Sequence, residues 1–222
     1  AYPESIIIID LPYNRRQGGA RNEGLKYASG EYIAFVDSDD WIEEGLYEKA
    51  YLKAKEKDAD IVQFNYNYYF DNVGIVCNKN EMKDEYIEIK CADDRKNMLI
   101  MEKFTYGCWN KLYKRSMVIN ANTAFAENVI YEDLDFLINI ALKINNTANV
   151  KEILYIYKNN DNSASHNNRE QIKFNDMLAV YKAIDRLKYD CNVDEAIKYA
   201  KITCIAGAIG ICLMNQDNNQ FS

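Results

Sequence analysis

The alternation of continuous apolar runs with helical periodicity over the first seventy residues predicts an α/β fold. Segments 5–9 and 32–36 are short and apolar throughout, which is typical of strands buried on both faces of a sheet. Segments 20–29 and 43–57 carry apolar residues at helical spacing. Segment 61–70 alternates apolar or aromatic with polar residues, as antiparallel strands do. The order strand–helix–strand–helix–strand favours the α/β class.

The pattern of the remaining chain predicts further strands and an all-helical tail. The expected strands are 74–77, 86–89 and 150–157, and the expected helices are 92–101, 132–144, 171–187 and 193–214. We therefore divide the chain into a sheet-containing domain at 1–157 and a loop with a C-terminal α-helical extension at 158–222. The last helix is apolar on nearly every side after Lys201. Its four candidate partners are the neighbouring helix and sheet, a second copy of the chain, the missing remainder of a longer chain, and a membrane surface.

Composition narrows the class of partner. The 222 residues include 27 Lys and Arg against 34 Asp and Glu, a net charge of −7, which argues against nucleic-acid binding. The six cysteines lack metal-site spacing, which favours free thiols in a reducing cytoplasm. No signal-peptide pattern is present, and the longest uncharged run, 202–216, is shorter than the about 20 residues of a membrane span. We expect a cytoplasmic protein, with contact to the inner face of the membrane left open.

Four polar residues, Asp37-Ser38-Asp39-Asp40, directly follow the apolar strand 32–36. Three carboxylates at this point repel one another unless a positive charge lies among them. Alternate acids at the carboxyl end of a parallel strand suit a divalent cation with oxygen ligands. An acidic turn with Asp40 as the N-cap of the next helix explains the same residues equally well.

The stretch around these acids, GGARNEGLKYASGEYIAFVDSDDWIE at 18–43, resembles the family 2 glycosyltransferases of the GT-A fold. Three later stretches match the same family in the same order: WNKLYKRS (109–116), YEDLDF (131–136) and YIYKNNDNSASH (155–166). The resemblance implies a GT-A-like (Rossmann-like) mixed sheet flanked by helices. It also implies inverting transfer of a sugar from a nucleotide-sugar donor to a hydroxyl of a saccharide or lipid-linked acceptor, in surface polysaccharide or glycan synthesis.

On the donor side, the resemblance implies that Asp37 and Asp39 form a D-x-D motif. The first acid would approach the ribose, and the second would bind Mn²⁺ or Mg²⁺ on the diphosphate, which leaves as an anion. Arg21 and Asn22 would lie near the nucleotide at a helix start, where free N–H groups favour phosphate. An ordinary arginine–acid ion pair is the other interpretation of Arg21. His166, the only histidine, is a candidate diphosphate or metal contact, although a lone loop histidine is usually incidental.

On the acceptor side, Glu132 and Asp133 match the family's E-D motif. The resemblance implies that Asp133 is the base that takes the acceptor proton, and that Glu132 binds the acceptor or supports the base. Acids that stabilise the start of a helix are the other interpretation. Trp109, Asn110 and Lys111 are expected in the acceptor region, where an indole face stacks on a sugar ring. A core tryptophan beside a surface lysine would give the same sequence.

Two other functions stay open. A haloacid-dehalogenase-like phosphatase also places D-x-D after a buried strand, but it requires Thr or Val where Trp41 stands. The second open function is a binding module that resembles a glycosyltransferase but is incomplete or degenerate and has no catalytic activity. Only six residues separate Asn14 from Arg21, which leaves no room for the family's nucleotide-binding strands. We therefore expect an N-terminally incomplete domain that binds nucleotide sugar weakly by itself.

Overall fold

The computed structural model describes residues 3–79, 81–101, 103–159, 170–187, 189, 193–202 and 205–206. The strands are β1 (Tyr32–Ala34), β2 (Trp41–Ile42), β3 (Ile61–Phe70), β4 (Gly74–Val76), β5 (Tyr86–Glu88), β6 (Lys111–Lys114) and β7 (Asn146–Lys158). The helices are η1 (Pro3–Ser5), α1 (Arg16–Tyr27), α2 (Leu46–Lys57), α3 (Ala92–Ile100), α4 (Arg115–Ala121), α5 (Glu132–Ala141) and α6 (Glu170–Asp185). Residues 194–202 are also helical.

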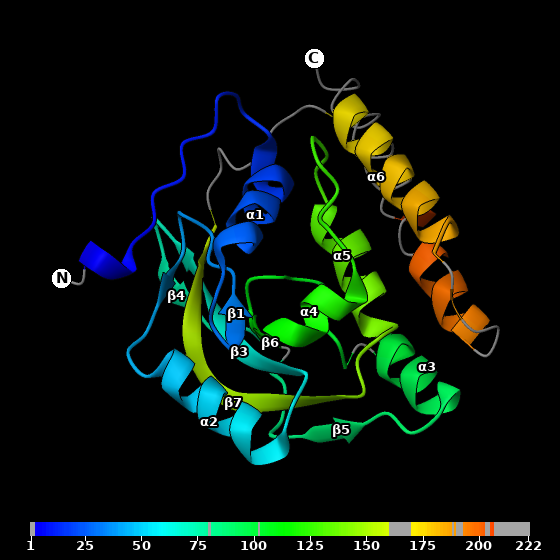
Figure 1. Ribbon diagram of the computed structural model, residues 1–222, viewed down its shortest axis with the longest axis horizontal. Coiled ribbons are helices and arrows are strands. Elements are labelled where there is room, and N and C mark those ends of the chain that lie inside the picture. Colours follow the sequence, from blue (N-terminus) through cyan, green and yellow to red (C-terminus); the bar gives the residue numbers. More distant parts are fainter. Residues whose placement is uncertain are drawn as a thin grey trace.

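These strands form one mixed, strongly curved sheet with helices on both faces (Figure 1). The strand order is β1-β6-β3-β7-β2, with β4 added to β3 and β5 to β7. The central pair β3 and β7 is parallel, whereas every other pair is antiparallel. The predicted α/β class with a mixed sheet flanked by helices is confirmed. Strand β3 was predicted as an antiparallel strand, and it pairs so with β4 and β6, but its longest partner, β7, runs parallel to it.

Helix α2 covers one face of the sheet. Its small and branched residues Leu46, Ala50 and Ala54 are fully buried against Val62 and Phe64 of β3. The i, i+4 spacing of these three residues places them on one side of the helix, as the sequence predicted. Gly45, with φ of 82°, precedes the helix in a backbone conformation that residues with a side chain rarely adopt. Helix α2 therefore begins after Gly45, and the prediction of Asp40 as its N-cap is wrong.

Aromatic packing holds the opposite face of the sheet against α5. The Phe125 and Phe136 rings stack at 3.9 Å, and Phe35, just after β1, meets both edge-on. Rings in these arrangements each contribute about 1 kcal/mol beyond the burial of their surface. This cluster fixes the segment before α5 directly beneath α1.

The helical tail packs on α5. Ile138 of α5 lies in one buried cluster with Met177, Val180 and Ile184 of α6 and with Ile197. Figure 1 shows α6 running beside α5 on the side away from α2. Among the described residues, no helix combines the length and apolar character required to cross a bilayer. The division at residue 157 and the partners of the last helix stay predictions, because residues 207–222 lie outside the described part.

The prediction of a buried strand at 5–9 is wrong. Only the short helix η1 and irregular backbone occur there, and Ile6, Ile7 and Ile8 are 66%, 64% and 89% exposed. Figure 1 shows this segment passing outside the sheet. An apolar run favours a buried strand, but burial also requires a partner strand, and no described strand pairs with these residues. The short elements β2, β6 and α4 were not predicted.

Candidate functional site

A cleft of about 850 Å³ opens where the loop after β1 meets the first turns of α1 and α5. The residues that line it are Gln17, Ala20, Arg21, Val36, Asp37, Ser38, Asp39, Tyr106, Gly107, Trp109, Ile130, Tyr131, Glu132, Asp133, Leu134 and Tyr157. This set contains six residues predicted from the sequence: Arg21, Asp37, Asp39, Trp109, Glu132 and Asp133. The fold therefore brings the donor-side and acceptor-side candidates into one cleft.

Arg21 joins the two groups of acids. One guanidinium nitrogen donates to Glu132 at 2.5 Å and to Asp133 at 2.8 Å, and the other donates to Asp37 at 2.7 Å. The guanidinium also lies 5.4 Å from the centre of the Phe125 ring, within cation–π range. The interpretation of Arg21 as a partner in an ion pair with acids is therefore confirmed. A nucleotide contact by Arg21 stays a prediction.

The charges at Arg21 and Glu132 are strongly coupled. Burial alone would lower the pKa of Arg21, but the carboxylates around it hold this pKa above its ordinary value. Burial raises the pKa of Glu132 to about 7, and neighbouring Asp133 adds to the rise while Arg21 opposes it. The Arg21 guanidinium therefore favours the charged form of Glu132, which burial and Asp133 oppose.

Asp133 is held at both carboxylate oxygens. Oδ1 accepts from Arg21, and Oδ2 accepts from the backbone N–H of Cys108 at 3.1 Å. Tyr131, which precedes α5, has φ of 72°, a left-handed conformation that is costly for a bulky residue. This turn lets α5 begin at Glu132, so that both acids occupy its first turn at the cleft.

Two positions outside the predicted set support this arrangement. A side chain at Gly18 would come within 2.2 Å of the Ala126 carbonyl oxygen, so only glycine allows α1 to lie this close to the segment before α5. Asp176 of α6 accepts from the backbone N–H of Ile130 at 2.8 Å and from Arg16 at 3.1 Å. The tail thereby fixes the segment that leads into Glu132. Nothing in the sequence pattern marked Asp176.

Asn22 faces the loop before α5 and does not line the cleft. Its amide nitrogen donates to the Phe125 carbonyl at 2.9 Å, and its amide oxygen accepts from the Phe125 N–H at 2.9 Å. These paired bonds hold the Phe125 ring beneath Arg21. The predicted nucleotide contact of Asn22 stays a prediction.

The three acids after β1 have different surroundings. Asp37 pairs with Arg21, and Asp39 is exposed at the edge of the cleft. Asp40 turns toward β7, where it accepts from the Tyr155 hydroxyl at 2.5 Å and the Lys158 N–H at 2.8 Å. Burial raises the pKa of Asp40 to about 6. Asp40 thus attaches the acidic loop to the sheet, while the other two acids face the cleft.

The donor set at the cleft fits a divalent ion that is shared with a substrate. Within the described residues, no three His, Cys, Asp or Glu side chains gather closely enough to hold a metal by themselves. Mg²⁺ bound with phosphates commonly uses only one or two protein carboxylates, together with water and phosphate oxygens. Asp37 and Asp39 supply such a pair. His166, the third predicted metal contact, lies outside the described residues.

The Trp109-Asn110-Lys111 stretch divides between the cleft and the interior. The Trp109 indole lines the cleft and stacks on Tyr155 and Tyr157 at centroid distances of 4.8 and 5.3 Å. Asn110 and Lys111 are 1% and 0% exposed behind it. The surface-lysine interpretation is therefore wrong, whereas acceptor contacts of Asn110 and Lys111 stay predictions.

Lys111 braces the turn that holds Asp133. Its ammonium group donates to the Thr105 hydroxyl at 2.7 Å, the Gly107 carbonyl at 2.7 Å and the Asn110 side-chain oxygen at 2.9 Å. The next residue after Gly107 is Cys108, whose N–H donates to Asp133. The buried Lys111 side chain thus fixes the backbone that orients the carboxylate.

Lys111 gives a testable dependence of stability on pH. Burial lowers the pKa of Lys111 to about 7, whereas the unfolded lysine keeps its ordinary value of about 10.4. Between these values the unfolded chain binds more protons, so the free energy of unfolding rises with pH. Relative to Lys111→Met, the wild-type chain should gain about 3 kcal/mol between pH 7 and pH 10 in urea unfolding. Lys114→Met, at a partly exposed lysine of the same strand, is the control, and parallel curves for wild type and Lys111→Met would refute the prediction.

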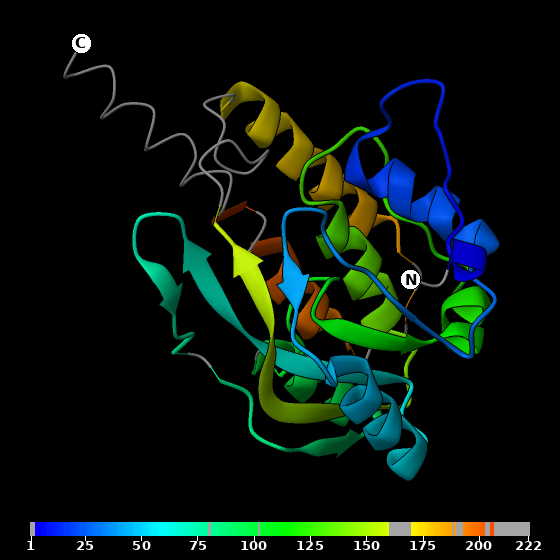
Figure 2. The ribbon, with the colours of Figure 1, turned by 90° about the vertical axis from the view of Figure 1, so that its left-hand side faces the viewer.

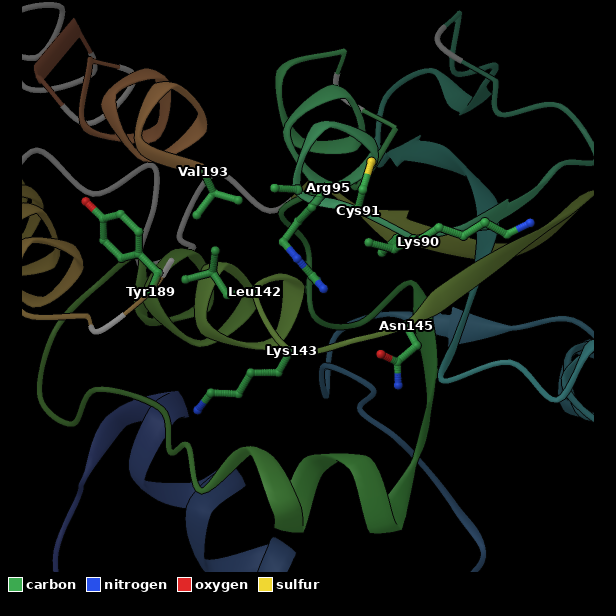
Figure 3. A pocket seen from close by; sticks show the side chains of 10 residues that line it. Lys90, Cys91, Arg95, Leu142, Lys143, Asn145, Tyr189 and Val193 are labelled. Carbon is green, nitrogen blue, oxygen red and sulfur yellow. The ribbon is translucent and has the colours of Figure 1, made fainter. Parts of the chain in front are cut away.

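A second pocket, of about 370 Å³, lies between α3, the end of α5 and the chain around Val193 (Figure 3). Lys90, Cys91 and Lys143 lie around it in Figure 3, with Arg95 at its centre. Arg95 donates to the Ala141 and Ile144 carbonyls at 2.7 and 2.8 Å, which satisfies the end of α5. None of the site residues predicted from the sequence lines this pocket, so it has no part in the proposed chemistry.

Comparison with known proteins gives consistent results. A family model described as Glycosyl transferase family 2 matches residues 1–120. The putative glycosyltransferase EpsH of Bacillus subtilis is 29% identical over 91% of this chain and 59% of its own length. Poly(ribitol-phosphate) beta-glucosyltransferase of Bacillus spizizenii is 29% identical over 69% of this chain and 23% of its own length. The chain thus spans little more than half of EpsH and less of the second relative.

The fold also has a counterpart of known structure. The crystal structure of S. aureus TarS 1-349 in complex with UDP-GlcNAc superimposes with a TM-score of 0.69 at 20% identity. The superposition covers 88% of this chain and 56% of that structure. At this identity the likeness shows a shared fold.

Proposed function

Because the chain belongs to glycosyl transferase family 2, we propose that its cleft transfers a sugar from a nucleotide-sugar donor to a hydroxyl of a saccharide or lipid-linked acceptor, with inversion. The observation that carries this proposal is the Arg21 guanidinium, which holds Asp37 and Asp133 in one cleft at 2.7 and 2.8 Å. One acid serves the donor, and the other serves the acceptor. The reaction needs both groups within reach of one anomeric carbon.

Asp133 acts as the general base. The acceptor hydroxyl gives its proton to Asp133 as its oxygen attacks the anomeric carbon. The bond from that carbon to the diphosphate oxygen breaks on the opposite face, and the diphosphate keeps the electron pair. The bonds from Arg21 and the Cys108 N–H orient the carboxylate. Glu132 fixes Arg21 and faces the acceptor side of the cleft.

Asp39, with Asp37 near it, would hold Mn²⁺ or Mg²⁺ on the donor diphosphate, and Asp37 would approach the ribose. When bound, the ion would supply positive charge to balance the charge on the leaving diphosphate. Exposed Asp39 is accessible to an ion that arrives with the donor, whereas Asp37 exchanges its bond to Arg21 for donor contacts. The complex of the structural neighbour with UDP-GlcNAc supports a nucleotide-sugar donor. The proposal thus names classes of substrate, a nucleotide sugar and a saccharide or lipid-linked acceptor. It also includes a position at the inner face of the membrane.

Thermal unfolding tests the donor half of the proposal. We expect UDP and UDP-N-acetylglucosamine to raise the melting temperature with Mn²⁺ present and to lose this effect in EDTA, because ligands of the folded state stabilise it. Asp39→Asn should lose the Mn²⁺-dependent rise, while Glu44→Gln, an exposed acid in the following loop, should keep it. A non-catalytic module would show the same rise without sugar transfer. An equal rise in EDTA, or in Asp39→Asn, would contradict the metal assignment.

A further inference from the structure

A row of aromatic side chains leaves the cleft along one face of the sheet. We call it the aromatic stripe and define it as Trp109, Tyr157 of β7, and Tyr66, Tyr68 and Phe70 of β3. Residues two apart on a strand share a face, so the three β3 residues lie on one side. Figure 2 shows the β3–β4 hairpin at the left, extending away from α2 at the bottom.

The rings of the aromatic stripe are in continuous contact. Trp109 lies 5.3 Å from Tyr157 and 4.6 Å from Tyr66, measured between ring centres. Tyr68 then lies 5.4 Å from Tyr66, 5.9 Å from Tyr157 and 6.4 Å from Phe70. Trp109 and Tyr157 also line the cleft. The stripe is therefore a direct continuation of the site, and β3 carries it about 13 Å further between Tyr66 and Phe70.

The face that carries the stripe has no charged side chain at its paired positions. Tyr68 pairs with Tyr157 on one side and with Val76 on the other, and Phe70 pairs with Gly74. Lys158 pairs instead with Tyr69, on the opposite face. All five rings of the stripe are partly exposed. The Tyr66 and Tyr68 hydroxyls lie 3.3 Å apart, so the stripe also carries hydrogen-bonding groups.

We propose that the aromatic stripe binds the acceptor as an extended, uncharged oligosaccharide, beyond the sugar unit that receives the transfer. Rings present flat apolar surfaces to the C–H faces of sugars, and tyrosine hydroxyls bond sugar hydroxyls. The described residues paired with the stripe on this face carry no charge, which disfavours a polyol-phosphate chain, and continuity with the cleft selects the acceptor as the occupant. This inference rests on the proposed function and adds the class and length of its acceptor.

Direct binding tests the stripe without relying on turnover. The 222-residue chain is titrated with a disaccharide, a tetrasaccharide and a hexasaccharide of β-1,4-linked glucose and of N-acetylglucosamine, and with a ribitol-phosphate oligomer. Affinity for one neutral series should increase with length, and Tyr68→Ala should weaken hexasaccharide binding about tenfold. Tyr69→Ala removes the neighbouring ring on the opposite face and should keep the length dependence. Phe70→Ala, at the end of the stripe, is a second variant that should reduce binding of the hexasaccharide more than of the disaccharide.

Several outcomes would overturn the proposal: affinity independent of length, an absence of neutral oligosaccharide binding, equal losses in Tyr68→Ala and Tyr69→Ala, or tighter binding of ribitol phosphate. The UDP-dependent rise in melting temperature is recorded on the same samples. If that rise is present and length dependence is absent, the stripe fails while the transferase proposal stands. If length-dependent binding is present without the rise, the transferase proposal fails and the stripe stands as a glycan site.

Discussion

Replacing Asp133 by asparagine is expected to lower sugar transfer by about a thousandfold or more, because a general base contributes this much to the rate and an amide cannot accept the proton. Asparagine keeps an oxygen that can accept from Arg21 or from the Cys108 N–H. The cleft should therefore keep its shape, and donor binding should persist. Transfer is measured with labelled UDP-sugar and an oligosaccharide acceptor, and donor binding by the rise in melting temperature with Mn²⁺.

Asp135→Asn is the matched control for this experiment. Asp135 lies two residues further along α5 and does not line the cleft, although burial raises its pKa to about 6. Its amide variant removes one acid from the same helical turn and should keep a rate close to that of the wild type. Transfer that survives in Asp133→Asn would refute its role as base. Loss of both transfer and donor binding would show that Asp133 shapes the donor site.

Local patterns in the sequence predicted much of the fold because they depend on neighbouring residues. The alternation in segment 61–70 gave β3 its observed bounds, and the apolar spacing after Glu132 gave α5 its observed start. The pattern in α5 reports a buried helix face. Burial in β3 does not alternate, because residues 61–65 are all buried and residues 66–70 are all partly exposed. The same reasoning failed at 5–9, where an apolar run has no described partner strand.

The sequence predicted which residues belong to the candidate site better than it predicted how those residues contact one another. The motifs located the acids, but two of the three ion pairs at Arg21 link residues more than a hundred positions apart and exist only in the folded chain. Neither the charge of Lys111 nor its neighbours in the sequence predicted its burial, because lysine is rarely buried. Asp176 acts through the backbone of a distant loop, which no residue pattern encodes.

Replacing Arg21 by methionine is expected to lower the free energy of unfolding by about 3 kcal/mol at pH 7.5, because loss of one partner leaves buried acids uncompensated. Glu132 is only 6% exposed, so its charge depends strongly on the guanidinium. Without Arg21, the pKa of Glu132 should rise further above its ordinary value, so the folded state binds more protons than the unfolded state between the ordinary and the raised values. Stability is then regained as pH falls, and the deficit in urea unfolding should shrink between pH 7.5 and pH 5.

Arg15→Met and a double variant show whether charge or packing causes the loss of stability in Arg21→Met. Arg15 also pairs with two acids, Glu23 and Glu127, but at the surface, where solvent screens the charges, so its loss should cost much less stability than the loss of Arg21. Adding Glu132→Gln to Arg21→Met should restore part of the lost stability, because it removes the charge that the arginine compensated. A deficit independent of pH, or a double variant less stable than Arg21→Met, would show that Arg21 stabilises the cleft by packing on Phe125 and not by charge. If both results are as expected, the acids of the two half-sites are held together by one cation, and a donor that displaces Asp37 from Arg21 changes the charge around Asp133 as it binds.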